Sequence, residues 1–378
     1  MSKPVKYHIG KFPPSKLDWP RLIPYLGSAA AAVARYDGIL TAVPNPELLL
    51  SPMTTQEAVL SSKIEGTQAS MSEVLEYEAD STDDRIPSSR REDIQEILNY
   101  RRAMGLAQGL LSKLPLSSRV VRDVHKQLMQ GVRGADKAPG EFRRIPNWIG
   151  PPGCTIEEAR FVPIDAGELP NAMSKWEVYV NDDQPDKLVQ LAILHAEFEA
   201  LHPFLDGNGR VGRMMVPLFM WQHGLIHRPM FYMSAYLEAF RDAYYEKLLA
   251  VSRDGDWTGW CEFFITGVQQ QAEANLEKAK EILDLYEELK PVATQATHSQ
   301  YAIHALDWIF SRPVFQSPVF ISDAEIPAST ARRILQEFKR AGILVEVRKA
   351  SGRRPALLAF WRLINTVEGK EIVSPPAR

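Results

Sequence analysis

The sequence predicts a mainly α-helical protein with two or three domains, and three observations support this prediction. The chain has 378 residues, more than one typical domain needs. It is 45% hydrophobic and 24% charged, a composition typical of globular proteins. Apolar residues recur at three- and four-residue spacing along most of the chain, and this spacing is that of a helix. Helical spacing is lost mainly over residues 5–14, 140–163 and 343–361, so we expect only small β elements.

Charge and cysteine content narrow the functional class. A net charge of −3 and a pI near 6.3 argue against nucleic-acid binding over the whole surface, although they leave room for one basic domain. The two cysteines, Cys154 and Cys261, fit a reducing compartment and have no metal-ligand spacing. Residues 1–19 hold no apolar run like that of a signal peptide, and no stretch reaches the length of a membrane span. We therefore expect a cytoplasmic protein without a membrane partner.

The N-terminal third predicts a helical region. An alanine-rich run at residues 29–34 suits close helix packing, and Thr54 or Thr55 is a suitable N-cap after a turn-rich joint at 44–52. His125 is a candidate second catalytic group, although a histidine on an amphipathic helix more often belongs to the core or the surface. Helices are expected over residues 17–36, 54–64, 72–79, 90–114 and 120–129.

Residues 140–163 predict an irregular β-hairpin. The segment 147–150 (Asn147, Trp148, Ile149 and Gly150) precedes a Pro-Pro-Gly turn, and a second extended run follows at 160–163. A surface loop is the alternative. Helical spacing then returns over residues 164–180 and 188–201.

Residues 202–213, with the sequence His-Pro-Phe-Leu-Asp-Gly-Asn-Gly-Arg-Val-Gly-Arg, carry the strongest functional signal. They form a tight loop between the helix at 188–201 and an apolar helix expected at 211–221. Gly207, Asn208 and Gly209 can adopt positive φ angles, so that successive N–H groups converge on one anion at the start of a helix.

Charged side chains in this loop complete a phosphate site. Arg210 and Arg213 lie three residues apart, on one helix face, where each can fork onto phosphate oxygens. Asp206 is a candidate Mg²⁺ ligand, and His202 is a candidate base that needs no large change in its pKa. Each pair of these residues also occurs in ordinary helix ends and turns, but the whole set in register favours polyphosphate chemistry.

The segment resembles the signature of the Fic family, His-x-Phe-x-(Asp/Glu)-Gly-Asn-Gly-Arg-x-x-Arg, at every fixed position. The resemblance implies transfer of AMP from ATP to a hydroxyl of a target protein, with ATP and Mg²⁺ required. It also implies that His202 is the base, that Asp206 binds Mg²⁺, and that the 207–209 loop, Arg210 and Arg213 hold the phosphates. Family members that act as kinases carry lysine at the second glycine, so Gly209 favours nucleotidyl transfer.

A second motif precedes the signature. Ser61 to Gly66 matches the pattern (Ser/Thr)-x-x-x-Glu-(Gly/Asn) of the inhibitory helix in Fic proteins. By itself, a glutamate before a glycine is an ordinary helix end. The resemblance implies that Glu65 pairs with Arg213 and misplaces the phosphates of ATP, with Ser61 as the other regulatory residue. We therefore expect autoinhibition within the same chain.

The resemblance assigns roles to two further segments. A β-hairpin flap lies over the active site in Fic proteins and aligns the target peptide by strand addition, which points to residues 147–150 here. Paired tyrosines contact the base and ribose of the nucleotide, which makes Tyr244 and Tyr245 candidates for this contact. Packing of one of these tyrosines in the core is the alternative.

The C-terminal part predicts a separate unit. Helices are expected over 241–255 and 257–289, followed by a polar linker at 291–298. Three helices over 301–310, 318–324 and 328–341 and two strands over 343–347 and 357–361 resemble a winged helix-turn-helix. DNA binding and protein recruitment are equally favoured partners for this unit. Its positive charge comes from Arg332, Arg333, Lys339, Arg340, Arg348, Lys349, Arg353 and Arg354.

Together these features predict three domains: a helical regulatory region at 1–112, a Fic catalytic core at 113–290 and a winged helix at 291–378. We expect an autoinhibited protein adenylyltransferase that acts on a Ser, Thr or Tyr hydroxyl of a target protein and on itself. The alternatives are an enzyme that removes AMP at the same site and a DNA-binding regulator whose core senses nucleotide. Fic proteins often dimerise, so a homodimer is a further expectation, although no stretch marks its interface.

Overall fold

The computed structural model describes residues 3–43, 45–81, 86–134, 136–352 and 354–376. This part of the chain contains sixteen α-helices and five short strands, which confirms the mainly α-helical fold. It divides into two compact units. The first unit comprises residues 1–37, 60–67 and 95–273, and the second comprises residues 38–59, 68–94 and 274–378.

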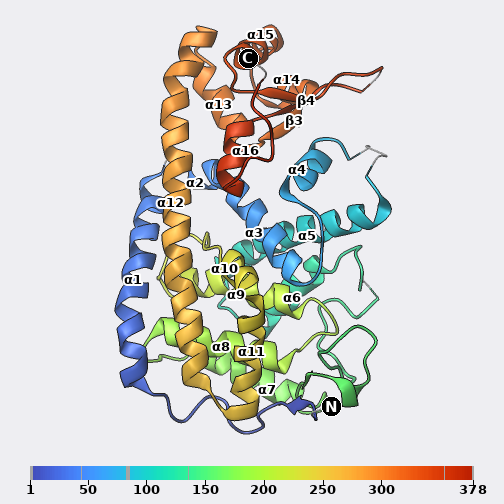
Figure 1. Cartoon of the computed structure of the whole chain (residues 1–378), viewed down its shortest axis with the longest axis vertical. Coiled ribbons are helices and arrows are strands. Elements are labelled where there is room, and N and C mark those ends of the chain that lie inside the picture. The colour runs from blue at the N-terminus through green and yellow to red at the C-terminus, as the bar shows by residue number, and fades with distance from the viewer. Residues whose placement is uncertain (1–2, 44, 82–85, 135, 353, 377–378) are drawn as a thin grey trace. The chain divides into compact units, whose positions relative to one another are not determined.

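Two almost completely buried helices, α8 (Lys187–Leu201) and α9 (Asn208–Gln222), form the core of the first unit (Figure 1). Both helices are buried on every side, and their buried residues are mainly apolar. Helix α7 (Leu169–Asn181) and helix α11 (Arg241–Asp254) contact α8, and α6 (Ser118–Leu128) contacts α9. The other helices with residues in this unit are α1 (Trp19–Ala42), α3 (Ser51–Ile64), α5 (Ser88–Leu111), α10 (Ser234–Ala239) and α12 (Trp257–Thr297).

The junction between α8 and α9 differs from the prediction in one respect. His202 ends α8 in the left-handed conformation with φ +46°, and Gly207 precedes α9 with φ +76°. Asn208 and Gly209 do not have positive φ, because they form the first turn of α9. The helix thus begins inside the signature, three residues earlier than expected, and its free N–H groups come from these residues.

Helix α3 also begins earlier than predicted. It starts at Ser51, so neither Thr54 nor Thr55 is its N-cap, and the joint at 44–52 contains the short helix α2 (Pro46–Leu49). Proline lacks the N–H that a first helical turn leaves unused, so Pro46 and Pro52 both fit helix starts. Helix α7 begins later than predicted, at Leu169.

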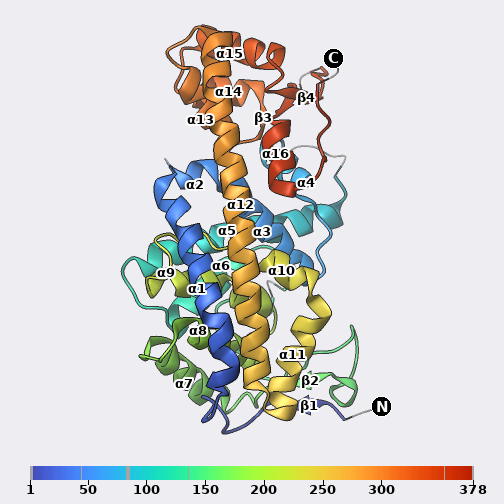
Figure 2. The same cartoon turned by 60° about the vertical axis from the view of Figure 1, so that its left-hand side comes forward.

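A small sheet near the N-terminus joins distant segments. Strand β1 (Val5–Lys6) pairs in parallel with β2 (Phe161–Val162), and the two lie side by side in Figure 2. Phe161 also forms an antiparallel bridge with Ile149. The predicted hairpin at 140–163 is therefore reduced to one bridge, with the 3-10 helix η1 (Ile156–Glu158) in its loop.

The second unit contains a three-stranded antiparallel sheet in the order β3-β5-β4. Its strands are β3 (Val314–Gln316), β4 (Val345–Arg348) and β5 (Leu357–Ala359). Figure 1 labels β3 and β4 of this sheet. The helices of this unit, besides α2 and the end of α12, are α4 (Met71–Ala79), α13 (Ala302–Ser311), α14 (Ser317–Asp323), α15 (Ala328–Arg340) and α16 (Trp361–Glu368).

Two predictions for this unit are wrong. Residues 291–297 are not a linker, because α12 continues through Pro291 to Thr297. Ala293 and Thr297 are completely buried, and this packing offsets the hydrogen bond that Pro291 lacks. Trp361 does not extend a strand but begins α16, whose buried Leu363, Ile364 and Val367 follow helical spacing.

The basic residues of this unit are only partly available to a partner. Arg348 forms an ion pair with Asp80, and Arg333 donates to the carbonyl of Thr297. Arg353 lies outside the described residues. The exposed basic side chains are those of Arg332, Arg333, Lys339, Arg340, Lys349 and Arg354. Among the described residues, no helix is both long and apolar enough to cross a membrane.

Candidate active site

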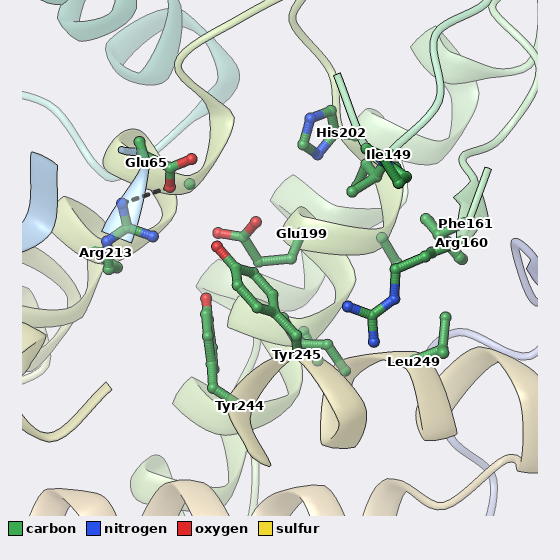
Figure 3. A pocket seen from close by; sticks show the side chains of 16 residues that line it. Glu65, Ile149, Arg160, Phe161, Glu199, His202, Arg213, Tyr244, Tyr245 and Leu249 are labelled. Atoms are coloured by element: carbon green, nitrogen blue, oxygen red, sulfur yellow. Dashed lines mark hydrogen bonds and ion pairs between the residues drawn. The ribbon is translucent and has the colours of Figure 1, made fainter. Parts of the chain in front are cut away.

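A cavity of about 430 Å³ in the first unit brings the two sequence motifs together (Figure 3). His202 and Glu199 enter it from the end of α8, and Gly209 and Arg213 enter it from α9. Glu65 reaches it from just beyond the end of α3. The remaining wall comes from Ile149, Gly150, Pro151, Arg160, Phe161, Ala196, Ala200, Tyr244, Tyr245, Leu248 and Leu249.

His202 lies on this cavity in a neutral form. Burial lowers its pKa to about 4, although the nearby negative charge of Glu65 acts in the opposite direction. The expectation of a small pKa change is therefore wrong. A neutral imidazole at pH 7 retains the lone pair that a general base needs.

Arg143, which sequence inspection did not single out, fixes the chain around His202. It is buried and donates to the carbonyls of His202 at 3.0 Å, Leu201 at 3.3 Å and Ile164 at 2.5 Å. The bonds to Leu201 and His202 satisfy carbonyls at the end of α8 that have no partner within the helix. A conspicuous Arg-Arg pair at 143–144 was the only sequence signal for it.

Asp206 and Arg210 belong to a charged network beside the cavity. Asp206 accepts from the Lys137 ammonium at 3.0 Å, and its other oxygen lies 3.6 Å from Arg210. Burial would raise the pKa of Asp206, but Lys137 and Arg210 outweigh this effect and lower it. Arg210 itself is buried and donates to Glu96 at 2.8 Å. Arg210 is thus absent from the cavity wall, in contrast to Arg213.

The Asn208 side chain closes the loop. Its Oδ1 accepts from the Phe204 N–H and its Nδ2 donates to the Phe204 carbonyl, both at 2.8 Å. His125 supports the same loop: its ring stacks on Phe204 with centroids 3.7 Å apart, and its Nε2 lies 3.0 Å from the Asp206 carbonyl. Because the Gly140 N–H donates to His125 Nδ1, Nε2 carries the proton. His125 does not line the cavity, so this candidate second catalytic group has a supporting position.

Glu65 and Arg213 form an ion pair, as the inhibitory motif predicts, between a buried guanidinium and a carboxylate whose side chain is 34% exposed. The distance from Arg213 Nη2 to Glu65 Oε1 is 2.6 Å (Figure 3). The Ser61 hydroxyl and carbonyl also accept from the Arg213 guanidinium, at 2.9 and 2.8 Å. Burial would raise the pKa of Glu65, but Arg213 lowers it. A Cβ atom at position 209 would overlap the Glu65 carboxylate, so the contact requires glycine there.

Glu199 is a second carboxyl group on the cavity, and the sequence analysis missed it. Burial raises its pKa to about 7, and Glu65 adds to this effect while Arg213 opposes it. Its Oε1 atom is buried without a hydrogen-bond partner. Two carboxyl groups near one guanidinium thus differ in protonation, with Glu65 ionised and Glu199 partly protonated near pH 7.

The two candidate tyrosines both reach the cavity but differ in burial. Tyr244 is completely buried and its hydroxyl lies 3.0 Å from His195 Nε2. Tyr245 is half-buried and stands beside Glu199 in Figure 3. Tyr245 is therefore the better placed of the two for contact with a bound molecule.

Only part of the predicted flap faces the cavity. Ile149 and Gly150 line it. Asn147 instead donates to the Phe204 carbonyl at 3.0 Å, which ties the flap to the signature loop. Trp148 donates to the Cys154 carbonyl at 2.9 Å and remains 42% exposed.

A divalent cation is compatible with Asp206. The residues described contain no cluster of three or more His, Cys, Asp or Glu side chains with metal-binding geometry. Mg²⁺ in nucleotide sites usually takes only one or two carboxylates and completes its shell with phosphates and water. Asp206 is ionised with its side chain 32% exposed, and so fits this requirement.

Comparisons with known proteins point in one direction. Residues 23–109 match the Fic/DOC family N-terminal model and residues 115–220 match the Fic/DOC family model, together about half of the chain. The protein adenylyltransferase Fic of Drosophila grimshawi is 28% identical over 133 residues, which cover 34% of this chain and 25% of that protein. A probable protein adenylyltransferase of Aquifex aeolicus is 26% identical over 203 residues, 52% of this chain and 57% of that protein. The matched region thus spans only about a quarter to about half of these relatives.

Solved structures support the fold. A Fic family protein from Desulfovibrio desulfuricans G20 superposes with a TM-score of 0.59 at 18% identity and covers 92% of this chain and 98% of that one. Residues 134–508 of Fic-1 from C. elegans superpose with a TM-score of 0.52 at 17% identity, covering 71% of this chain and 75% of that one. At these identities the likeness concerns the fold alone.

Proposed function

Because the chain belongs to the Fic/DOC family, we propose that it is a protein adenylyltransferase that moves AMP from ATP to a hydroxyl side chain of a target protein. The observation that carries this proposal is the cavity. It places a neutral histidine, a helix N-terminus and a buried arginine within reach of one bound molecule. Adenylyltransferases among its relatives support the same reaction.

The residues of the chain suit this reaction. His202 takes the proton from the attacking hydroxyl, because burial keeps its imidazole neutral. The hydroxyl oxygen bonds to the α-phosphorus of ATP as the bond from that phosphorus to the β-phosphate oxygen breaks, and pyrophosphate leaves. The free N–H groups at the start of α9 receive the charge that develops on the phosphates. Arg213 binds the terminal phosphate, and Tyr245 lies beside the nucleoside. Mg²⁺ held by Asp206 would neutralise charge on the α- and β-phosphates.

Arg210 takes a different part in this proposal from the one that the signature implies. It is buried against Glu96 and Asp206 and absent from the cavity wall. It therefore acts on the nucleotide through Asp206, whose carboxylate it keeps ionised and oriented.

Glu65 makes the protein autoinhibited in this proposal. Its carboxylate holds the guanidinium that the terminal phosphate needs, and it adds a negative charge beside that phosphate. Nucleotide can enter, but its phosphates lie out of line for attack. The place of Glu65 on the cavity wall also supports the alternative of AMP removal, in which this carboxylate activates a water molecule.

One experiment tests the proposal. Four proteins are compared: the wild type, Glu65→Gly, His202→Ala and the double variant with both substitutions. Each is incubated with Mg²⁺ and with ATP labelled at either the α- or the γ-phosphate. We expect α-label on protein to rise about 10- to 100-fold in Glu65→Gly, as expected when a charge-assisted hydrogen bond of about 1.5–3 kcal/mol is released. His202→Ala in the Glu65→Gly background should lose about 10²- to 10⁴-fold.

Other outcomes separate the alternatives. Label from the γ-phosphate alone means a kinase and contradicts the proposal. Faster release of AMP from a pre-modified protein by the wild type than by Glu65→Gly means that AMP removal is the reaction. Autophosphorylation is distinguished from adenylylation by the mass added to the protein.

A further inference from the structure

A cluster of four polar side chains, three of them buried and one half-buried, lies outside the cavity and has no part in the chemistry above. We call Tyr7, His8, Glu197 and Ser252 the Glu197 cluster. Tyr7 donates to Glu197 Oε1 at 2.6 Å, and His8 Nε2 lies 2.9 Å from Glu197 Oε2. His8 Nδ1 lies 2.8 Å from the Ser252 hydroxyl. The carboxylate is completely buried, and burial of an ionised group requires such partners.

The Glu197 cluster has the order of a Ser-His-acid triad but does not resemble a second active site in its surroundings. Ser252, His8 and Glu197 are all buried, and none of them lines the cavity. A nucleophilic serine needs space for a substrate beside its hydroxyl. His8 also packs edge-on against Trp257, with ring centroids 5.1 Å apart. The cluster therefore holds elements together.

The elements that it joins are the first strand and two helices of the cavity. Tyr7 and His8 directly follow β1 (Val5–Lys6), Glu197 belongs to α8 and Ser252 belongs to α11. Burial, reinforced by the charge of Glu197, raises the pKa of Tyr7, so its hydroxyl keeps the proton it donates. His202 ends the helix that begins at Lys187 and carries Glu197.

Strand β1 in turn holds the flap. Val5 donates to the Arg160 carbonyl at 3.1 Å and Tyr7 donates to the Val162 carbonyl at 3.0 Å. On the opposite edge, Phe161 and Ile149 bridge each other through bonds of 2.9 and 3.1 Å. A flap with a single bridge is weakly held by itself, because an isolated two-stranded hairpin is marginally stable. Strand β1 pairs with β2 as a third strand and supplies the missing support.

We propose that Tyr7 and His8 are positioning residues that fix the flap relative to His202 through the Glu197 cluster. The path runs from His202 along α8 to Glu197, across to β1, and from β1 to β2 and Ile149. Because β1 occupies one edge of β2, an acceptor peptide that adds as a strand has only the outer edge at residues 148–150 to pair with. The part about acceptor docking rests on the proposed function, whereas the part about the flap does not.

Hydrogen exchange tests the part that needs no activity. In Tyr7→Phe and in His8→Ala we expect amides of residues 147–162 to exchange about tenfold faster or more, since each loses a hydrogen bond to a charged group. Amides of α9 should keep their protection. His8→Gln should restore the flap, because its amide can donate to Glu197 and accept from Ser252. Lys6→Ala is the matched control, since Lys6 is exposed and its backbone stays paired.

Activity tests the second part. With Glu65→Gly as the parent, Tyr7→Phe and His8→Ala should lower AMP incorporation about tenfold, and Lys6→Ala should not. Unchanged flap exchange in both variants, or equal acceleration throughout α8, α9 and the flap, would overturn the inference. Faster flap exchange in proteins whose Glu65→Gly parent incorporates no AMP would instead reject the proposed function and leave the role of the cluster intact.

Discussion

At the scale of single residues, the raised pKa of Glu199 makes the stability of the fold depend on pH. The pKa of Glu199 is about 7 in the folded protein against an ordinary value of 4.5. Below pH 4.5 it is protonated in both the folded and unfolded states and has no effect on stability. Between pH 4.5 and 7 only the unfolded chain releases the proton, so the stability of the fold declines as the pH rises, and the decline is complete above pH 7.

Glu199→Gln should therefore leave stability unchanged at pH 4 and raise it at pH 8, by roughly 3 kcal/mol at most. Urea denaturation of the wild type and the variant across this range measures the difference. Glu157→Gln, at an exposed position, is the control that should show no such trend. A difference between Glu199→Gln and wild type that does not vary with pH would contradict the assignment.

Sequence inspection identified the cavity residues that belong to a motif, because their order in the chain matches a family pattern. His202, Gly209 and Arg213 come from the signature and Glu65 comes from the inhibitory motif, and all four lie on the cavity wall. It did not find Glu199, Arg143 or Glu197. Each of these lies within a helix or a short extended run, where a single charged residue is usually exposed. Their burial depends on partners that are distant in sequence, such as the 190 residues between Tyr7 and Glu197.

At the scale of elements, the end of α3 and the first turn of α9 fit together only without a side chain at position 209. We expect Gly209→Ala to destabilise the protein by about 1–3 kcal/mol, because its Cβ overlaps the Glu65 carboxylate. In a Glu65→Ala background the same substitution should cost less, with a coupling free energy of about 1 kcal/mol or more. A double-mutant cycle in urea measures this coupling.

The control for this cycle is Gly105→Ala in α5. A Cβ at Gly105 meets nothing within 4 Å, so this variant should be slightly more stable regardless of residue 65. Additive effects of Gly209→Ala and Glu65→Ala would mean that α3 and α9 are not held against each other by this contact.

Element types were more predictable than element ends. Helical spacing identified most of the longer helices, because a buried face repeats every three to four residues. The predicted starts of α3 and α9 and the predicted end of α12 were wrong for local reasons. Pro52 and Pro291 look like helix breakers in the sequence. Pro52, however, lies in the first turn of α3, and Pro291 lies inside α12, where the burial of neighbouring residues stabilises the helix.

At the scale of the whole molecule, the second unit decides whether the protein also contacts DNA. Its C-terminal elements run in the order α13, β3, α14, α15, β4, β5 and α16, which includes the three helices and two strands that the sequence leads us to expect. Four of its basic residues, Arg333, Lys339, Arg340 and Arg348, already contact a carbonyl or a carboxylate of the protein. A DNA contact therefore depends on the basic side chains that remain exposed.

The test of this contact compares variants of the full chain with labelled duplex DNA by fluorescence anisotropy. If these side chains reach phosphates, replacing Arg332, Lys339 and Lys349 by Gln together should weaken binding. It should also reduce the slope of log K against log salt by about one for each lost contact. The matched control is Gln336→Ala, because Gln336 lies on α15 with Arg332 and Lys339 and is exposed but uncharged. This variant should bind DNA as the wild type does.

If the triple variant binds DNA with the same affinity as the wild type, DNA contact by this surface is ruled out. If neither protein binds DNA, duplex DNA should leave the rate of AMP incorporation by Glu65→Gly unchanged, because no DNA-bound state exists to alter it. A rate that changes with duplex DNA while the triple variant still binds would place the DNA contact elsewhere on the chain.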